Sequence, residues 1–466
     1  MLHGSRYLRG RWSATVLVES IKRSVFVLQP GQNRSFGPTG PYWRRSLRSP
    51  GGGDNLFVAS IVAIRPDTGE YVWHYQETPG DQWDYTATNH MILSDLTIGG
   101  KKRKVLMQAP KNGFFYVLDR TNGKLISAEP YIKVNWASGI DKKTGRPIMN
   151  PEADYSKNGG KTWMAMPGAL GAHDWMPMAY NPGTGLVYIP AQELGFPYKA
   201  DANFKPKTHG INLGVDLGAL NLPDDPKIQA AVRATVKGYL IAWDPVTQKE
   251  VWRAPHDGAW NGGVLSTSGN LVFQGDGSGK LNAYNAKTGQ RLWSYPVQTG
   301  VVAPPVTWAK DGKQYVTLVA GWGGAYPLLV GGLSLDARGK KIPNKSRVLT
   351  FALGGTAKLP AADVATDMPL DPPAQFANAA TIAIGQQAYD RSCVACHGSG
   401  AISGGIAPDL RYSGTIADQT AWNSVVIDGV LSDQGMISFK ENFTPKEIEA
   451  IRAYVIARAQ VAAKTK

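Results

Sequence analysis

The sequence predicts a large all-β propeller followed by a small all-α domain at the C-terminus. Three observations carry this prediction. An internal repeat occurs before residue 300, the 466 residues include 53 Gly, 31 Pro and 14 Trp, and helical periodicity is scarce before residue 379. Glycine and proline in such numbers favour short strands joined by tight turns. At roughly 100–200 residues per domain, this length is typical of two or three domains.

The chain begins with an atypical basic leader at residues 1–39. Residues 1–50 hold nine Lys or Arg and one acidic residue, and the whole chain carries a formal net charge of +14. A basic arm can bind nucleic acid or an anionic membrane, but this one lacks repeated basic–aromatic spacing and any recognisable nucleic-acid fold. We interpret it as a solvated leader and expect no nucleic-acid partner.

The internal repeat predicts the propeller. Each copy is typical of a strand, a turn that contains Asp or Asn with Gly, and a returning strand. The copies are residues 63–73, 242–252 and 283–293, with weaker ones at 118–123 and 179–185. The last two full copies end in tryptophans 41 residues apart, close to the ~40–50 residues of a four-stranded propeller blade.

We expect the repeated Trp73, Trp252 and Trp293 to be structural, each wedged between neighbouring blades. Residues 40–354 are the predicted propeller region and allow roughly five to seven blades at ~45–60 residues each. Residues 355–378 follow as an extended linker, because several prolines fall there in a stretch with little hydrophobic periodicity.

The most specific motif is Cys393-Val394-Ala395-Cys396-His397, which holds the only two cysteines of the sequence. Cys-x-x-Cys-His is the pattern of covalent c-type haem attachment, in which both thiols form thioether bonds and the imidazole binds the iron. A four-cysteine zinc site is excluded because no other cysteine exists. A redox dithiol is the alternative, and we favour haem.

Met436, in a loop-like stretch 39 residues after His397, is the candidate for the sixth iron ligand. Ligation by His and Met favours a relatively high reduction potential and thus electron acceptance. The alternative is a core methionine that fills a gap. A closing helix is predicted by the capping box of Thr444 and Glu447. Its apolar residues recur at helical spacing at Ile448, Ile451, Tyr454 and Val455.

Together these residues resemble a class I cytochrome c domain over 379–466. The resemblance implies that Pro408 lies against the haem and accepts a hydrogen bond from His397 through its carbonyl. Because haem c is attached outside the cytoplasm, we expect a periplasmic location. No signal peptide is recognisable, since Glu19 interrupts the nearest apolar run, and no transmembrane segment is found. Either export information is missing from this chain or its start is misassigned.

The tryptophan repeats resemble the docking motifs of the pyrroloquinoline quinone (PQQ) alcohol dehydrogenases, over about residues 40–353. Residues 80–86 resemble the catalytic loop of that family, so Asp84 would be the general base and a ligand of the adjacent Ca2+. The alternative is an aspartate in an ordinary turn. Thr86 stands where some relatives have an Asp associated with a lanthanide, which favours calcium.

Other residues match cofactor contacts of the same family. Lys111 matches the cationic contact to the quinone oxygens and would stabilise the negative charge of the reduced quinone; a solvated turn lysine is the alternative. Asp174 and Trp175 match a segment in which the quinohaemoprotein members have Asn-Trp. The preceding His173 is expected to be structural. Glycine-rich segments would let the backbone approach a flat ligand at residues 260–263 and at 321–325, which include Gly324 and Ala325.

Several features of the family are missing. The sequence has no adjacent-cysteine pair, and Thr39 stands where relatives have an Asn that binds calcium. The resemblance becomes readable only near residue 40, whereas the family closes its ring with eight blades. We therefore expect an N-terminally truncated quinohaemoprotein dehydrogenase with an incomplete PQQ site.

Two functions are compatible with these features. The first is oxidation of a primary or related alcohol to the aldehyde by hydride transfer to PQQ, with electrons passed to haem c and on to an external cytochrome, cupredoxin or quinone. The second is an electron-transfer cytochrome c on a truncated, catalytically silent propeller. The sequence favours the first, because the loop around Asp84 is intact.

Overall fold

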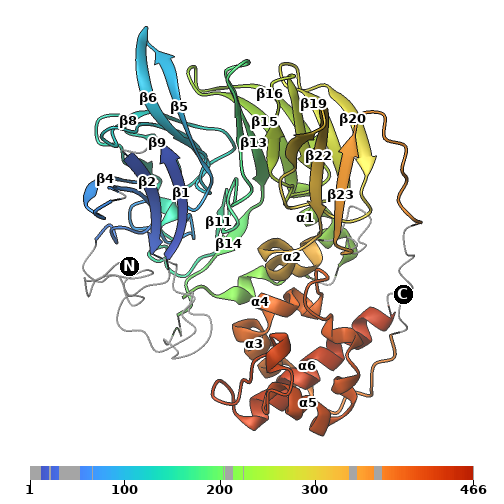
Figure 1. Ribbon diagram of the computed structural model, residues 1–466. Helices are drawn as coiled ribbons and strands as arrows, with labels where there is room; N and C mark the ends of the chain where they lie inside the picture. The colour runs from blue at the N-terminus through green and yellow to red at the C-terminus, as the bar shows by residue number, and fades with distance from the viewer. Residues whose placement is uncertain are drawn as a thin grey trace. The chain divides into compact units, whose positions relative to one another are not determined.

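The computed structural model describes strands at 12–19 and 23–30 and then residues 53–65, 67–202, 204, 214–223, 225–334, 344–361 and 370–464. The chain divides into two compact units. The β unit comprises Met1–Val215, Thr235–Gly321 and Ser346–Gly355, and the helical unit comprises Asp216–Ala234, Trp322–Lys345 and Thr356–Lys466. Figure 1 shows the strands of the β unit and the helices of the helical unit.

The β unit is built from antiparallel sheets of consecutive or nearly consecutive strands. Four sheets have four strands each. The first holds β1 (Trp12–Glu19), β2 (Arg23–Pro30), β3 (Ser60–Ile64) and β4 (Tyr71–Gln76), and the second holds β5 (Met91–Ile98), β6 (Lys101–Gln108), β7 (Phe114–Asp119) and β8 (Leu125–Pro130). The third holds β12 (Ala179–Asn181), β13 (Leu186–Glu193), β15 (Lys237–Asp244) and β16 (Lys249–His256), and the fourth holds β17 (Val264–Ser266), β18 (Leu271–Gly275), β19 (Lys280–Asn285) and β20 (Arg291–Pro296).

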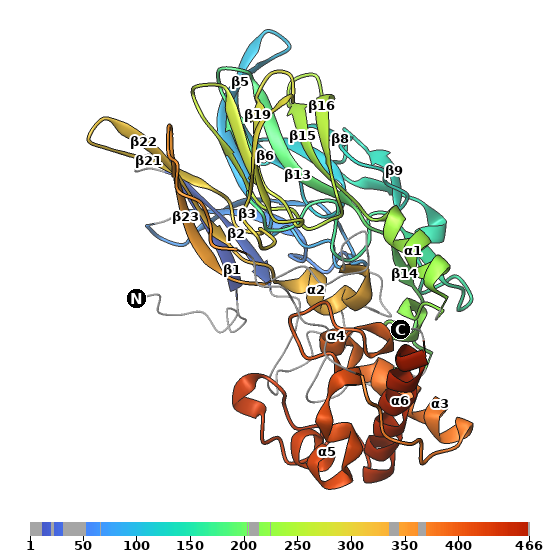
Figure 2. The same ribbon diagram turned by 90° about the vertical axis from the view of Figure 1, so that its right-hand side faces the viewer.

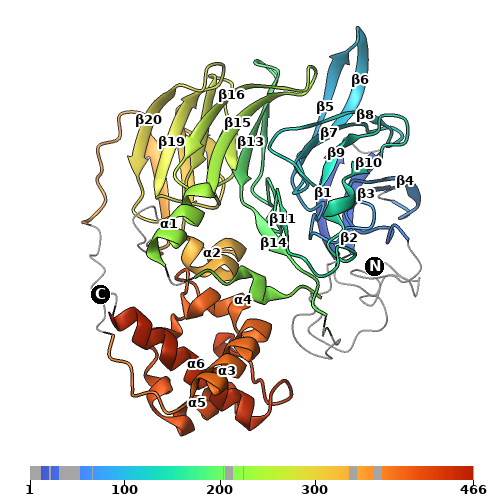
Figure 3. The same cartoon turned by 180° about the vertical axis from the view of Figure 1, so that it is seen from behind.

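Smaller sheets complete the described part of this unit. One has three strands, β21 (Val306–Lys310), β22 (Lys313–Ala320) and β23 (Arg347–Ala352); two have two strands, β9 (Ala137–Ile140) with β10 (Pro147–Met149) and β11 (Trp163–Ala165) with β14 (Phe196–Tyr198); and η2 covers Pro151–Ala153. Figure 2 shows that the hairpins of β5–β6 and β21–β22 extend beyond their neighbours, and Figure 3 shows β11 and β14 below β13.

Hydrophobic cores lie between successive sheets. Phe115 and Val117 of β7 share one core with Ile189 of β13 and Ile241 of β15. The third and fourth sheets share another core, which includes Tyr188, Leu240, Val272 and Tyr284. Consecutive sheets packed face to face are the arrangement of propeller blades, in agreement with the predicted fold class.

Four of the five repeated segments form the hairpin between the last two strands of a sheet, whereas the weaker copy at 179–185 joins β12 to β13, the first two strands of its sheet. In each of these four hairpins, a backbone N–H at a left-handed position closes the turn onto a carbonyl four residues earlier. The donors are Gly69, Gly123, Gln248 and Gly289, with φ between 56° and 73°. Glycine adopts this conformation without steric cost. Gln248 is the exception, and it is the position where the sequence repeat also loses its glycine.

Two repeat tryptophans dock on the turn of the next sheet, as predicted. The Trp73 indole N–H donates to the Arg120 carbonyl at 3.2 Å, and that of Trp252 donates to the Ala286 carbonyl at 3.1 Å. Each ring covers a turn glycine so closely that a Cβ on Gly123 or Gly289 would lie within 2.6 Å of the indole. The repeat thus encodes a blade-to-blade contact.

The expectation of a wedged core residue is wrong for Trp293, which is 39% exposed. Its ring stacks on Tyr295 and meets Phe351 of β23 edge-on at 5.5 Å. The neighbouring sheet has three strands and presents a strand phenylalanine to this indole, so the ring is covered only in part.

Two strands fall within the region predicted to be a solvated leader. β1 and β2 pair along their whole lengths, and Ser24 to Phe26 of β2 pair with β3. The expectation is therefore wrong for these residues. Their runs of Val, Leu and Phe have high strand propensity, which outweighs the basic composition. Thr39 and the segment at 40–43 lie outside the described residues, as do residues 362–369 of the predicted linker.

The helical unit combines the C-terminal region with two excursions from the β unit. Its elements are η3 (Leu217–Leu220), α1 (Pro226–Thr235, the last residue of which counts with the β unit), α2 (Ala325–Val330), η4 (Gly331–Ser334), α3 (Ala379–Ser392), α4 (Val394–His397), η5 (Ser399–Ala401), η6 (Leu410–Tyr412), η7 (Gly414–Ala417), α5 (Gln419–Val426), η8 (Ser432–Gln434) and α6 (Pro445–Lys464).

The closing helix α6 forms as its sequence predicts. The Glu447 carboxylate accepts hydrogen bonds from the backbone N–H and hydroxyl of Thr444, and the Glu447 N–H donates to the Thr444 hydroxyl. This reciprocal pair is the predicted capping box. Ile448, Ile451 and Val455 are buried against α3 and α5 residues in one hydrophobic cluster. Within the described residues, no helix is both long and apolar enough to cross a bilayer.

The contact between Trp252 and its turn can be tested by Gly289→Ala. Gly312→Ala is the matched control, because Gly312 has a similar φ of 71° and a Cβ placed there would have no atom within 4 Å, whereas Gly289 has a φ of 72° and meets the indole. Both variants carry about 1–2 kcal/mol of left-handed strain. We expect Gly289→Ala to lose about 1–3 kcal/mol more, measured by urea unfolding. Equal losses would contradict this contact.

Candidate functional site

The loop between β4 and β5 presents Asp84 between two buried aromatic residues. Trp83 and Tyr85 are fully buried. The Trp83 indole donates to the Ala153 carbonyl at 3.0 Å, and the Tyr85 hydroxyl donates to the Pro167 carbonyl at 2.5 Å. The two flanking rings therefore anchor the loop while the Asp84 side chain stays 32% exposed.

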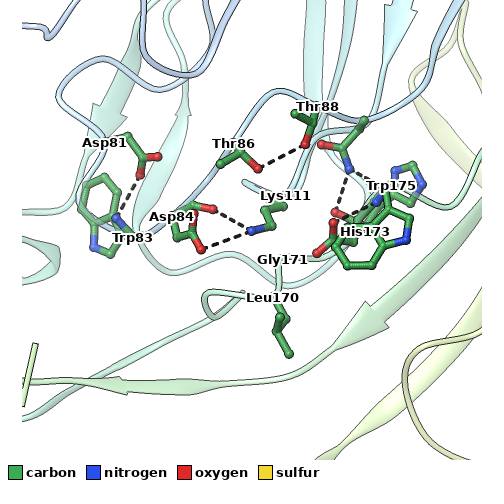
Figure 4. A network of polar contacts seen from close by, with 12 residues as sticks. Asp81, Trp83, Asp84, Thr86, Thr88, Lys111, Leu170, Gly171, His173 and Trp175 are labelled. Atoms are coloured by element: carbon green, nitrogen blue, oxygen red, sulfur yellow. Dashed lines mark hydrogen bonds and ion pairs between the residues drawn. The ribbon is translucent and has the colours of Figure 1, made fainter. Parts of the chain in front are cut away.

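Lys111 lies in the turn after β6 and points at Asp84 (Figure 4). Its Nζ donates to the Asp84 carbonyl at 3.0 Å and lies 3.5 Å from the Asp84 carboxylate Oδ2. The Lys111 side chain is 8% exposed, so the alternative of a solvated turn lysine is not what the structure shows. The sequence-predicted base and cation are thus direct neighbours.

The charge of Lys111 is set by its surroundings. Burial alone lowers the pKa of this ammonium group, but the carboxylates of Asp84, Asp174 and Asp81 together raise the pKa above its ordinary value. Lys111 is therefore held as a cation. A buried ammonium among acidic groups can stabilise negative charge that develops on a neighbouring ligand.

Asp81 is a functional candidate that the sequence reasoning missed. Its Oδ1 accepts a hydrogen bond from the Trp83 backbone N–H at 2.9 Å. Burial raises the pKa of Asp81 to about 7, and repulsion from Asp84 adds to this rise. A single loop thus carries two carboxyl groups in different environments. The only sequence signal for Asp81 is its place directly after Gly80 in the loop that contains Asp84.

Asp174 and Trp175 lie in the segment between β11 and β12 and belong to the β unit, as do Asp84 and Lys111. Asp174 is buried and its Oδ1 accepts from the Trp175 backbone N–H at 2.9 Å. The Trp175 ring is 47% exposed and stands edge-on at 5.0 Å to Trp260. Trp260 is fully buried, and its backbone N–H donates to Gln192. A fixed, exposed indole offers a flat surface for a planar ligand.

His173 is structural, as expected. Its Nδ1 and Nε2 lie 2.6 Å from the carbonyl oxygens of Ala109 and Met176. Burial lowers the pKa of His173 to about 4, although its hydrogen bonds to the two carbonyls act in the opposite direction. Both ring nitrogens face backbone oxygens, and neither is open to a metal.

The remaining predicted quinone contacts belong to the helical unit. Gly324 and Ala325 stand at the start of α2 and belong to the helical unit, whereas Asp84, Lys111 and Asp174 belong to the β unit. The described residues therefore fit a quinone at Lys111 and the exposed face of Trp175. They do not fit a complete metal centre, because no group of three His, Cys, Asp or Glu residues converges anywhere in the described ranges.

The two thiols of the Cys-x-x-Cys-His motif follow α3 directly. Cys393 caps the end of α3 and is half-buried, and Cys396 lies within α4 and is exposed. The N–H groups of Cys396 and His397 both donate to the Cys393 carbonyl, at 3.1 and 2.9 Å. This single helical turn brings Cys393, Cys396 and His397 together in the pattern of covalent haem attachment.

His397 has the surroundings that suit a neutral, metal-binding histidine. Its Nδ1 lies 2.8 Å from the Pro408 carbonyl oxygen, which confirms the predicted contact and fixes the proton on Nδ1. Burial lowers the pKa of His397, so the lone pair of Nε2 stays available. A backbone acceptor on the far ring nitrogen is how proteins orient a metal-binding histidine.

Met436 lies in a tight loop after η8. Gly435 adopts a left-handed φ of 94°, and the Met436 N–H donates to the Leu431 carbonyl at 3.2 Å. The Met436 side chain packs against the hydrophobic cluster that Cys393 also contacts. The residues of the helical unit thus fit a c-type haem with His397 and Met436 as its axial ligands.

The raised pKa of Asp81 makes a pH-dependent prediction. From an ordinary value of 3.8 to about 7, the folded chain binds this proton more tightly than the unfolded chain. The resulting stability is complete below about pH 4 and is lost as pH rises through about 7. The unaltered chain should therefore lose free energy of unfolding between pH 5 and pH 8. We expect Asp81→Asn to remove about 2–4 kcal/mol of that loss, measured by urea unfolding at both pH values.

The control for this experiment is Asp141→Asn. Asp141 is exposed, and hydrogen bonds from the Thr144 and Lys143 N–H groups lower its pKa. The contribution of the ionised Asp141 to the free energy of unfolding is the same throughout pH 5–8. The control should therefore leave the difference in unfolding free energy between pH 5 and pH 8 unchanged. An unaltered pH profile in Asp81→Asn would contradict the prediction.

Comparisons with known proteins agree with the two predicted modules. Family models match residues 45–134 (glucose/ethanol/alcohol dehydrogenase, beta-propeller domain), 236–319 (outer membrane protein assembly factor BamB) and 380–455 (cytochrome c oxidase, cbb3-type, subunit III). These matches confirm the predicted fold class, a PQQ-type propeller region followed by a helical cytochrome c domain.

Relatives with both modules match most of the chain. Quinohemoprotein alcohol dehydrogenase ADH IIB of Pseudomonas putida is 49% identical over 90% of this chain and 59% of its own length. The dehydrogenase subunit of alcohol dehydrogenase (quinone) of Komagataeibacter europaeus is 47% identical over 90% of this chain and 57% of its own.

The solved structure of ADHIIG from Pseudomonas putida HK5 has a TM-score of 0.85 and 46% identity, over 95% of this chain and 63% of that chain. The chain therefore spans little more than half the length of the curated relatives it matches. Sequence, propeller sheets and cytochrome c domain agree over nine-tenths of the chain, which accordingly belongs to the quinohaemoprotein alcohol dehydrogenase family.

Proposed function

We propose that this chain carries the catalytic half of a PQQ- and haem c-dependent oxidation of a primary or related alcohol to the aldehyde. The observation that supports this most is the contact between the buried cation of Lys111 and the partly exposed carboxylate of Asp84. For this activity we propose a propeller region that ends at 354 and includes β1 and β2 in addition to the predicted 40–354, a linker at 355–378 and a cytochrome c domain at 379–466.

The acid–base step belongs to Asp84. Its carboxylate is 32% exposed, while the loop around it is anchored by Trp83 and Tyr85. A carboxylate held in this way accepts the proton of the substrate hydroxyl as the carbinol hydride leaves. Lys111 binds the Asp84 carbonyl and presents its charge toward the same face, where it stabilises developing negative charge.

The cofactors we propose are PQQ, haem c and Ca2+. When bound, PQQ supplies a hydride acceptor and haem c a one-electron carrier. Lys111, Asp174 and Trp175 would hold the quinone. Asp84 would give Ca2+ one carboxylate; because the described residues do not complete its ligand set, no step is assigned to the ion.

The haem would be held by the thioether bonds of Cys393 and Cys396 and by axial bonds from His397 and Met436. Attachment of haem c outside the cytoplasm supports a periplasmic location for the mature protein. The external acceptor would be a cytochrome, a cupredoxin or a quinone. Ligation by His and Met suits transfer to such an acceptor, because it favours a relatively high reduction potential.

The activity is tested with the haem-loaded chain after addition of PQQ, Ca2+ and 1-butanol. We expect haem reduction that slows by about 10²–10⁴-fold in Asp84→Asn. Asp141→Asn is the control, since that residue is exposed. Both variants should still be reduced by ascorbate. Reduction by ascorbate alone in the unaltered chain would support the electron-transfer function and overturn the dehydrogenase proposal.

The role of Met436 predicts a specific variant. Met436→Leu keeps the contact with the hydrophobic cluster but removes the sulfur ligand. We expect the ferric haem to lose its methionine-to-iron absorption band and its reduction potential to fall, because loss of the thioether removes a ligand that favours the ferrous state. An unchanged band and potential would assign Met436 to core packing.

A further inference from the structure

One carboxamide joins the two sides of the haem-attachment motif. Asn221, in the excursion 216–234, donates from Nδ2 to the Asp390 Oδ2 at 2.6 Å and accepts at Oδ1 from the Ser399 hydroxyl at 2.6 Å. Asp390 precedes Cys393 by three residues on α3, and Ser399 follows His397 by two. All three residues belong to the helical unit. Asn221 therefore links the residues that enclose the motif at 393–397.

Asp390 is a buried carboxyl group that lies one helical turn before the first haem-binding cysteine. It is 8% exposed, and within the described residues its Oδ1 has no hydrogen-bond partner. Burial raises the pKa of Asp390 to about 6, the hydrogen bond from Asn221 lowers it, and the negative charge of Asp216 raises it. This carboxyl group titrates in a range where many side chains of its kind are fully ionised.

Several charged groups on neighbouring elements are engaged elsewhere, including Asp409, which pairs with Arg411. On α6, Glu447 pairs with Arg391, and Glu449 pairs with Arg452. Arg458 of α6 donates to the Gly400 carbonyl. The imidazole of His397 on α4 is held by Pro408.

From η3, Asp216 accepts from the Gly218 N–H at 3.0 Å, and its charge acts on Asp390. Gly218 itself lies against Asp390, since a Cβ there would be 3.9 Å from the Asp390 Oδ2. Asp390 therefore faces one hydrogen-bond donor, Asn221, and one repulsive negative charge, that of Asp216, both from the same excursion.

We propose that Asn221 is a positioning residue for the haem-attachment segment, and that Asp390, which it binds, releases a proton when the attached haem is oxidised. The proposal rests on the haem of the proposed function. Oxidation removes one electron, which passes to the external acceptor, and the Asp390 proton passes to solvent; reduction takes both back. The added positive charge favours the carboxylate form of Asp390, and the coupling is reciprocal.

The consequence is a haem reduction potential that falls as pH rises through about 6. At low pH, Asp390 is neutral in both haem states; at high pH, its carboxylate stabilises the ferric state. A tenfold difference in proton affinity between the two haem states corresponds to about 59 mV for one electron. The pH dependence therefore measures the coupling directly.

The test is a mediated redox titration of the full-length haem-loaded protein from about pH 5 to 8, which requires neither PQQ nor alcohol. Asp390→Asn should abolish the part of the slope centred near pH 6. Asn221→Leu should raise the pH at which this slope is centred by about one unit, because the Asp390 carboxylate loses its hydrogen-bond donor. Asp216→Asn should move it downward, because a repulsive charge is removed.

The matched control is Gln229→Leu. Gln229 lies in the same excursion and donates to the Pro223 carbonyl rather than to the haem-attachment segment; its profile should equal that of the unaltered chain. If Asn221→Leu does not fold, the near-isosteric Asp390→Asn and Asp216→Asn still decide the matter. Shifts of opposite sign are not expected from a general loss of stability.

Two failures are distinguishable. A purified protein without covalently attached haem overturns the proposed function, and this inference with it. A protein with attached haem, whose slope is the same in the unaltered chain and in Asp390→Asn, overturns this inference alone. Equal profiles for Asn221→Leu and Gln229→Leu would likewise show that Asn221 does not position the segment.

Discussion

The buried cation of Lys111 is the constraint on which the quinone-side site depends. Removing an ammonium group from water costs several kcal/mol unless opposite charges compensate, and here Asp84, Asp81 and Asp174 do so. The dependence is mutual, because two of these carboxyl groups lie on one loop whose aromatic residues are buried. The same ion pair therefore stabilises the cation and ties the loop to it, while the Asp84 carboxylate stays partly exposed.

The sequence predicted those features that local patterns encode. The hairpin repeats, the Trp73 and Trp252 docking contacts and the α6 capping box each depend on residues a few positions apart or on a motif that recurs. The contact of His397 with Pro408 was predicted through family resemblance. The same resemblance singled out Asp84 and Lys111, but their direct contact is a finding of the structure. At these positions the residue that forms the local turn, cap or contact is also the residue that the overall fold needs there.

Other features depend on burial, which the sequence does not display. Asp81 and Asp84 are both aspartates in one loop, yet burial raises the pKa of Asp81 to about 7 while Asp84 reaches solvent. Trp293 ends the same repeat as Trp252 but meets a strand phenylalanine instead of a turn glycine. Identical patterns therefore acquire different roles according to the neighbour that the tertiary fold supplies.

The link at Asn221 shows the same limit at longer range. Its partners Asp390 and Ser399 lie 169 and 178 residues away in the sequence, so no local motif announces the contact. The chemistry of the pair nevertheless selects the residue type: Asp390 needs a donor and Ser399 offers a hydroxyl that needs an acceptor. A carboxamide presents one of each in a fixed plane, whereas Asp at 221 would set two carboxylates against each other and Leu would satisfy neither partner. The haem-binding segment thus depends on a side chain that lies outside the contiguous C-terminal sequence.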